Sequence, residues 1–282
     1  MSTAAPTAAP ARPRAARRVR WSARRIVLSG IGALILLVVL VPGVFTGDDW
    51  NSVNVADKFL GPSLDHPFGT DEAGRDILQR MIHGARLSIG SALAVAFAAA
   101  AIGTVYGAIS GWAGGWVDRI LMRIVDVFLA FPYLVLAMAL AAAIGRDMKS
   151  AVIALIIVWW PSYARMVRGR VLSLKRDLHV RAARTLGASS AQLLRWHVVP
   201  HTFSEINARL TVDIGYALVA LTGLSFLGLA AQGSSPEWGL MVSTAKGFVL
   251  SAWWYALFPG VVILLTVLYF VRVGDELAGE ES

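Results

Sequence analysis

Six long apolar stretches alternate with shorter polar segments along the chain. A helix of about 20 mostly apolar residues crosses the roughly 30 Å hydrocarbon core of a bilayer. The chain is also 56% hydrophobic, whereas soluble domains are about 45–50% apolar. The pattern predicts an all-α membrane protein with six transmembrane helices, over residues 26–45, 85–112, 121–144, 151–166, 206–229 and 253–271.

Basic residues gather in two of the polar segments. The region before residue 26 holds many Arg and no acid, and residues 164–200 hold eight basic residues against Asp177 alone. Residues 47–83 are net acidic. Because cytoplasmic loops carry the excess of Lys and Arg, both termini and the 164–200 segment are expected in the cytoplasm. Membrane topology also accounts for the net charge of +8, so no nucleic acid partner is expected.

The segment "RAARTLGASSAQLLRWHVVPH" (181–201) is polar although two apolar stretches flank it. Helix formers lie on both sides of Gly187, which suits a sharp bend, and Ser189 or Ser190 can cap the second half. Pro200 is expected to end that second helix. A small apolar face is expected from Ala182, Ala183, Leu186, Leu193 and Leu194. Such a helix either docks into a groove on a partner or lies on the membrane surface.

Two acids fall inside the apolar stretches, where ionisable residues are functional candidates. Asp126 lies one turn from Arg123, so a local ion pair is the simpler interpretation. Asp213 has no obvious local partner and is expected to face either a translocation path or another membrane chain. Both are therefore candidates for the translocation path.

Before the second stretch, "GTDEAGRD" is typical of a helix start. Thr70 is the expected N-cap, and the pairs Asp71–Arg75 and Asp76–Arg80 have i,i+4 spacing. Further along, Gly103, Gly107 and Gly111 form a stripe that predicts close packing against a neighbouring helix.

Several kinds of chemistry lack their residues in this sequence. There is no Cys, no G-x-x-x-x-G-K-[ST] phosphate loop and no Cys/His cluster. No catalytic residue, metal site or cofactor of its own is therefore expected, and an ATP-driven transporter would have to borrow its ATPase from other chains.

The 181–201 segment resembles the EAA loop of ABC importer permeases. The matching positions are Ala182, Ala183, Gly187, Val199 and Pro200, while Arg181 replaces the usual leading Glu. Further stretches are similar to the dipeptide/oligopeptide/nickel group, in the same order: "HPFGTDEAGRDILQRMIHGARLSI", "GGWVDRILMRIVDVFLAFPYLVLA", "GLSFLGLAAQGSSPEWG" and "WWYALFPGVVILLTVL". Within that group the chain resembles the second, DppC/OppC-type permease subunit.

The resemblance implies a type I, MetI-like permease fold in a bacterial cell membrane, with no catalytic activity of its own. It implies three kinds of partner beside lipid: a DppB/OppB-type second permease, DppD/DppF- or OppD/OppF-type ATPases that bind ATP and Mg²⁺, and an extracytoplasmic substrate-binding protein. The implied cargo is dipeptides or oligopeptides, with nickel chelates as the alternative. The implied ATPase-coupling residues are Arg181, Ala182, Ala183, Leu186, Gly187, Ala188 and Pro200.

The expected organisation follows from these boundaries. A disordered basic tail (1–25) precedes the first transmembrane helix (26–45), an external loop and helix (46–84), a five-helix permease domain (85–272) with its coupling loop (177–200), and a cytoplasmic tail (273–282). A stand-alone channel or secondary carrier, or an anchoring subunit without a transport path, remain alternatives.

Overall fold

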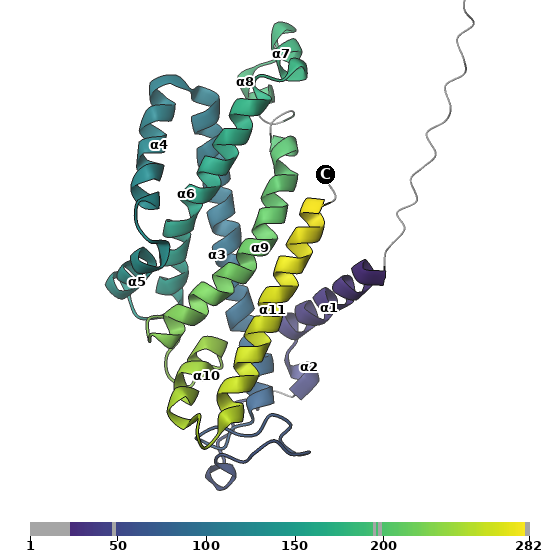
Figure 1. Ribbon diagram of the computed structural model, residues 1–282, viewed down its shortest axis with the longest axis vertical. Coiled ribbons are helices and arrows are strands. Elements are labelled where there is room, and N and C mark those ends of the chain that lie inside the picture. Colours follow the sequence, from purple (N-terminus) through teal and green to yellow (C-terminus); the bar gives the residue numbers. More distant parts are fainter. Residues whose placement is uncertain (1–22, 47–48, 194–195, 197–198, 280–282) are drawn as a thin grey trace, which may run out of the picture.

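The computed structural model describes residues 23–46, 49–193, 196 and 199–279. Residues 1–22 of the expected tail therefore lie outside the described residues. The described chain is almost entirely helical (Figure 1). Its elements are α1 (Ala23–Leu40), α2 (Gly43–Thr46), η1 (Val55–Asp57), α3 (Ile77–Ala113), α4 (Gly115–Leu129), α5 (Tyr133–Ile144), α6 (Met148–Leu174), α7 (Leu178–Thr185), α8 (Ser190–Leu193), α9 (Val199–Phe226), α10 (Trp238–Ala245), η3 (Lys246–Phe248) and α11 (Trp253–Gly279).

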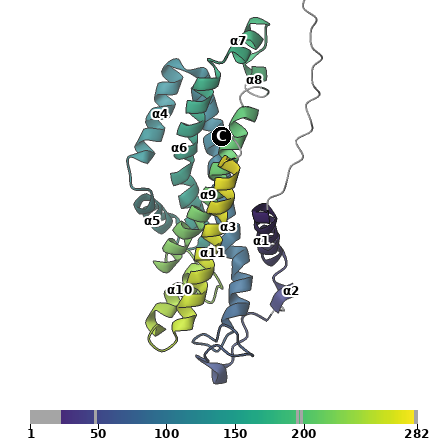
Figure 2. The same cartoon turned by 45° about the vertical axis from the view of Figure 1, so that its right-hand side comes forward.

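The long helices form an elongated bundle. α3 runs through it and packs most extensively against α6, while α9 packs against both α3 and α11. Both views place α1 beside the bundle on one side and α4 with α5 on the other (Figures 1 and 2). α7 and α8 project from one end, and α10 with the 49–76 loop covers the opposite end. The two ends therefore carry different polar structures, separated by the length of the bundle.

The expected glycine stripe brings α3 against α6. A Cβ at Gly103 would collide with the carbonyl of Trp160 and with Tyr163, and one at Gly107 would collide with the backbone of Ala164. Gly111 faces Arg168 and Val171 in the same way. Small residues allow this close approach of two backbones, which is a main source of helix association in lipid.

Four segments are long and apolar enough to cross a membrane: α3, α6, Glu205–Phe226 within α9, and α11. α4 and α5 pass the same test only when they are taken together, and the two are bent by 87°. The continuous helix expected over 121–144 is therefore wrong. The break falls at Phe131 and Pro132, because proline disfavours helical backbone in the residue before it and removes a helical N–H donor. The first expected span, 26–45, overlaps α1 only up to Leu40. The 18 residues of α1 lie at the short end of the about 17–25 needed, and α1 is not among the segments above.

The start of α3 differs from the expectation. Its N-cap is Asp76, whose carboxylate accepts from the N–H of Gln79 at 2.9 Å. Thr70 instead lies in the preceding loop, where its hydroxyl donates to the carbonyl of Asp57. That loop folds back on itself. The N-cap of α3 is therefore Asp76, six residues after the expected Thr70.

The acidic and basic residues of this loop form a buried cluster. Asp71 pairs with Arg75 at 2.7 Å, as the i,i+4 spacing predicts. The expected Asp76–Arg80 pair is replaced: Arg80 approaches Asp71 at 3.6 Å, and Asp76 pairs with His66 at 2.9 Å. Capping α3 commits the Asp76 carboxylate to the helix end, so Arg80 turns to the buried carboxylate behind it.

The beginning of α1 and the end of α11 meet. Arg24 and Glu276 form an ion pair of 2.7 Å. Two parts of the expected organisation shift accordingly: residues 23–25 belong to α1, and residues 273–279 continue α11 as helix. The C-terminal end of α11 points toward the end of the bundle that carries α7 and α8, whereas α1 lies beside the bundle nearer its middle (Figure 1).

Candidate functional site: an exposed elbow and a polar cavity

The elbow comprises α7, the turn at Gly187 and α8. Gly187 has a φ of 91°, in the left-handed region that favours glycine. After the turn, the hydroxyl of Ser189 accepts from the N–H of Gln192 at 3.3 Å, and the side chain of Gln192 accepts from the N–H of Ser189 at 2.8 Å. This reciprocal capping box starts α8 at the place expected for the second half. The predicted helix–bend–helix shape is thus present.

The apolar residues of the elbow divide between two faces. Leu186 is 88% exposed and Leu178 is 81% exposed, whereas Val180 and Leu193 are buried. The expected single apolar face joining Leu186 to Leu193 is therefore wrong, and Leu194 lies outside the described residues. The turn at Gly187 redirects the chain, so residues on either side of it point in different directions.

The expected coupling residues surround this exposed leucine. Arg181 and Ala182 are exposed together with Gly187, and Ala183 and Ala188 are half-buried. Small side chains beside a protruding leucine leave the backbone of the elbow open to a partner.

Pro200 does not end the second short helix. α8 ends at Leu193, and Pro200 is the second residue of α9. Proline suits the first turn of a helix, because its missing N–H would have had no partner inside the helix there.

A polar clamp fixes the base of the elbow to the bundle. Arg168 of α6 binds both carboxylate oxygens of Asp118 on α4, at 2.5 and 2.6 Å, and the hydroxyl of Ser110 donates to the same carboxylate. At the end of α6, Lys175 donates to the backbone carbonyls of Gly111 and Trp112 at the end of α3. Sequence reasoning did not assign these contacts, although Asp118, Arg168 and Lys175 are ionisable side chains near the ends of apolar stretches.

Asp126 has a different partner from the one expected. It pairs with Arg165 of α6 at 2.6 Å, and both side chains are about half exposed on the bundle surface. The local pair with Arg123 is not formed, because α6 packs beside α4 and offers a second guanidinium across the interface.

Asp213 lies in a cavity between α5, α6 and α9. Its carboxylate pairs with Arg209 one turn earlier on α9, at 3.2 Å. The guanidinium carbon of Arg209 also lies 5.0 Å from the centre of the Tyr163 ring. Sequence reasoning missed Arg209, although its i−4 spacing from Asp213 signals the pair. The cavity has a volume of about 320 Å³ and is lined by Tyr133, Trp159, Ser162, Arg209, Asp213 and Tyr216.

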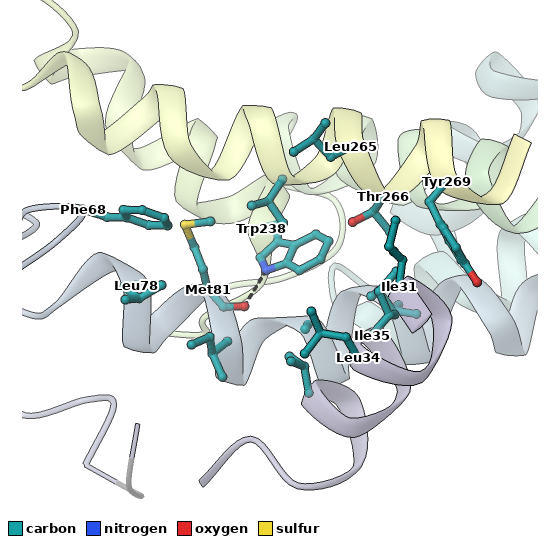
Figure 3. Close-up of a pocket in the computed structure, with 15 residues that line it drawn as sticks. Ile31, Leu34, Ile35, Phe68, Leu78, Met81, Trp238, Leu265, Thr266 and Tyr269 are labelled. Atoms are coloured by element: carbon teal, nitrogen blue, oxygen red, sulfur yellow. Dashed lines mark hydrogen bonds between the residues drawn. The ribbon is translucent and has the colours of Figure 1, made fainter. Parts of the chain in front are cut away.

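At the opposite end of the molecule, a buried acid caps α10. Glu237 is fully buried and accepts from the N–H groups of Gly239 at 2.9 Å and Leu240 at 2.7 Å. Burial raises the pKa of this carboxyl above its ordinary value, although its hydrogen bonds oppose the shift. The neighbouring Trp238 donates from its indole to the carbonyl of Met81 on α3 at 2.8 Å (Figure 3). These contacts attach α10 and the loop before it to the N-terminal part of α3.

Figure 3 shows a second hollow, which is almost wholly apolar. It is about 410 Å³ in volume and lies where α1, α3 and α11 meet. Aliphatic side chains such as Ile31, Leu34 and Leu265 line it, with the polar tips of Thr266 and Tyr269 at one end. Polar groups that could bind a charged substrate thus gather in the other cavity, beside Asp213.

Residues 103–275 match the family described as the binding-protein-dependent transport system inner membrane component. The chain belongs to this family. The match runs from the glycine stripe of α3 through the elbow to the last helix, so it covers both the elbow and the polar cavity.

Three known permease proteins are similar to this chain over nearly its whole length. The probable D,D-dipeptide transport system permease protein DdpC of Escherichia coli K12 is 40% identical over 90% of this chain and 87% of its own length. The dipeptide transport system permease protein DppC of Alkalihalophilus pseudofirmus is 38% identical over 88% and 81%. A glutathione transport system permease protein GsiD of Escherichia coli is 40% identical over 90% and 86%.

As a member of this family, the chain is a multi-pass membrane permease subunit of an ABC importer, not an enzyme. Such importers combine two permeases, ATPase subunits and a substrate-binding protein. The expected fold class and the expected kind of function are confirmed.

Proposed function

We propose that this chain forms one half of the translocation pathway of an ATP-driven importer for dipeptides or oligopeptides. The names of the dipeptide and glutathione permeases that resemble it support a peptide cargo. A DppB/OppB-type permease supplies the other half, and an extracytoplasmic binding protein delivers the peptide. ATPases of the DppD/DppF or OppD/OppF type bind ATP and Mg²⁺.

The observation that carries this proposal is the exposed elbow. An isolated leucine on a protein surface is common, but Leu186 lies at a constrained glycine turn at the tip of the bundle. The alternative, a helix lying on the membrane surface, requires a continuous apolar face. The burial of Leu193 removes half of that face, so docking into a groove of an ATPase is the better fit.

The clamp below the elbow gives the docked helix a route into the bundle. Movement of α7 reaches α6 directly along the chain, α4 through the Asp118–Arg168 pair, and α3 through Lys175. When ATP binding brings two ATPases together, the elbows of both permeases move with them. Rocking of the two bundles then opens the pathway alternately to either side, driven by the different affinity of the ATPases for ATP in the two states.

Orientation and the path residues complete the proposal. The basic residues around the elbow support a cytoplasmic position for that end of the bundle. Of the two candidate path residues, Asp213 lies in a cavity, whereas Asp126 is held by Arg165 on the bundle surface. Asp213 is therefore the one assigned to the pathway.

The test is Leu186→Glu in the complete importer. A buried charge in the ATPase groove opposes docking, so we expect at least a tenfold loss of peptide-stimulated ATP hydrolysis and weaker copurification of the ATPases. Leu64→Glu is the matched control, because Leu64 is also fully exposed but lies in the loop at the opposite end. Unchanged ATP hydrolysis and copurification in Leu186→Glu would contradict the coupling role.

A further inference from the structure

The cavity beside Asp213 is lined by aromatic and charged side chains. The rings of Tyr133 and Trp159 lie with their centres 6.2 Å apart and their planes tilted by 59°. The exposed Tyr216 of α9 also lines the cavity. Arg209 and Asp213 supply the charges. A volume of about 320 Å³ is at the lower end of the roughly 300–1,000 Å³ of small-molecule sites. The cavity is therefore the size of a peptide end rather than of a long peptide.

The two charges are not equally available. The side chain of Asp213 is 14% exposed, whereas that of Arg209 is 39% exposed. Asp213 engages the Nε of Arg209, and a guanidinium carries five N–H donors. The Tyr163 ring lies beneath the guanidinium as well. The pair therefore presents an oriented cation to the cavity, with its carboxylate withdrawn behind it.

This charged surface is not compatible with lipid. Charged side chains inside membrane segments face a water-filled path or another protein. Glu205, Arg209, Asp213 and Tyr216 are spaced four, four and three residues apart, so they follow one face of α9. Glu205 pairs with Arg170 of α6 nearer the elbow, at 3.1 Å. A polar strip thus leads from the cavity toward the elbow end, as a translocation path requires.

We propose that Arg209 binds the free terminal carboxylate of a peptide during its passage. This inference rests on the peptide-import function proposed above. The guanidinium forms charge-assisted hydrogen bonds with the carboxylate, and Tyr133, Trp159 and Tyr216 pack against the last side chain. Asp213 and Tyr163 are positioning residues, which hold the guanidinium toward the cavity. The chemistry selects a peptide with an unblocked C-terminus.

The test is direct binding to the complete importer in nanodiscs, without nucleotide and without the binding protein. The probes are radiolabelled dialanine and its C-terminal amide. We expect the importer to bind dialanine at least tenfold more tightly than the amide. Arg209→Gln should lower that ratio to nearly one, whereas Arg209→Lys should retain part of it, because lysine keeps the charge but not the planar fork.

Arg123→Gln is the matched control, since Arg123 is an exposed arginine on α4 that does not line the cavity. It should leave the ratio unchanged. If Arg209→Gln does not assemble, Tyr216→Ala replaces it, and a severalfold loss of dialanine affinity is expected. The inference is overturned if the importer shows no saturable binding or no preference for the free carboxylate, if Arg209→Gln keeps the preference, or if Tyr216→Ala keeps full affinity.

Two further readouts on the same samples separate the possible failures. If Arg209 instead pairs with an acid of the second permease, Arg209→Gln lowers copurification of that chain while dialanine binding keeps its preference, which overturns the inference. If ATPases copurify and respond to peptide but no carboxylate preference exists, only the carboxylate site fails. If no ATPase copurifies, the proposed function fails as well.

Discussion

Glu237 shows how a single side chain can organise an end of this molecule. The carboxylate is fully buried, yet it caps α10 by accepting from two backbone N–H groups. Trp238 follows it directly. Its backbone N–H donates to the hydroxyl oxygen of Ser88, and its indole N–H donates to the carbonyl of Met81. Neighbouring residues thus join α10 to α3 by hydrogen bonds that are shielded from water.

The raised pKa of Glu237 gives a pH-dependent prediction. The folded chain binds this proton more tightly than the unfolded chain does, so the group favours folding most at pH values below its ordinary pKa of 4.5. That contribution is lost as the pH rises through the raised folded value. Glu237→Gln does not titrate and loses part of the cap, worth about 1 kcal/mol. We expect its thermal unfolding temperature to lie furthest below that of the natural importer at pH 5, with the gap narrowing at pH 8; a gap that widens with pH would contradict this.

Which ion pairs could be predicted depended on how far apart their partners lie in sequence. Asp71–Arg75 follows from i,i+4 spacing and is present. Arg209–Asp213 has the same spacing and was available from the sequence, but it was missed. Asp126–Arg165 and Asp118–Arg168 join different helices. The spacing of residues along one helix carries no information on those pairs, since they depend on how α4 packs against α6.

At the scale of elements, the contact between α3 and α6 depends on glycine. The i+4 spacing of the glycines on α3 predicts a close helix contact. It does not predict that α6 is the partner, because many apolar helices could have faced this stripe. The break between α4 and α5 could also have been read, since Pro132 occurs inside the stretch. The prediction nevertheless joined the two helices into one span, because the apolar composition continues across Pro132.

Gly107→Ala tests this helix contact. The added Cβ would overlap the backbone of Ala164, which cannot move aside as a flexible side chain can. We expect a loss of about 1–3 kcal/mol from overpacking, seen as a lower unfolding temperature of the purified importer. Gly90→Ala is the control on the same helix, where a Cβ meets nothing within 4 Å. That variant should be as stable or slightly more stable, because alanine favours helix; equal stability of the two variants would refute the close contact.

At the scale of the whole molecule, the sequence predicted an all-α membrane fold with polar structures at opposite ends. Long apolar stretches and the distribution of arginine carry that information directly. The shape of the cavity beside Asp213 was not predictable, since it depends on side chains from α5, α6 and α9 meeting in space.

The proposed orientation can be tested by single-cysteine labelling, because the chain has no Cys of its own. Leu64→Cys and Leu186→Cys place thiols at fully or largely exposed positions at opposite ends. A membrane-impermeant maleimide should label Leu64→Cys in intact cells and Leu186→Cys only after permeabilisation. The chain is expressed without its ATPases, so that docking does not cover Leu186. The opposite labelling pattern would reverse the topology.

The 37 residues of α3 make a rod about 55 Å long at 1.5 Å per residue, well beyond the roughly 30 Å apolar thickness of a bilayer. Its N-terminal end is held by Arg80 and the Trp238 indole, and its C-terminal end by Lys175. A rigid rod pivoting at mid-membrane moves its two ends in opposite directions. In the proposed transport cycle, tilting of this one helix would therefore couple the arrival of cargo at one membrane surface to nucleotide-driven motion at the other.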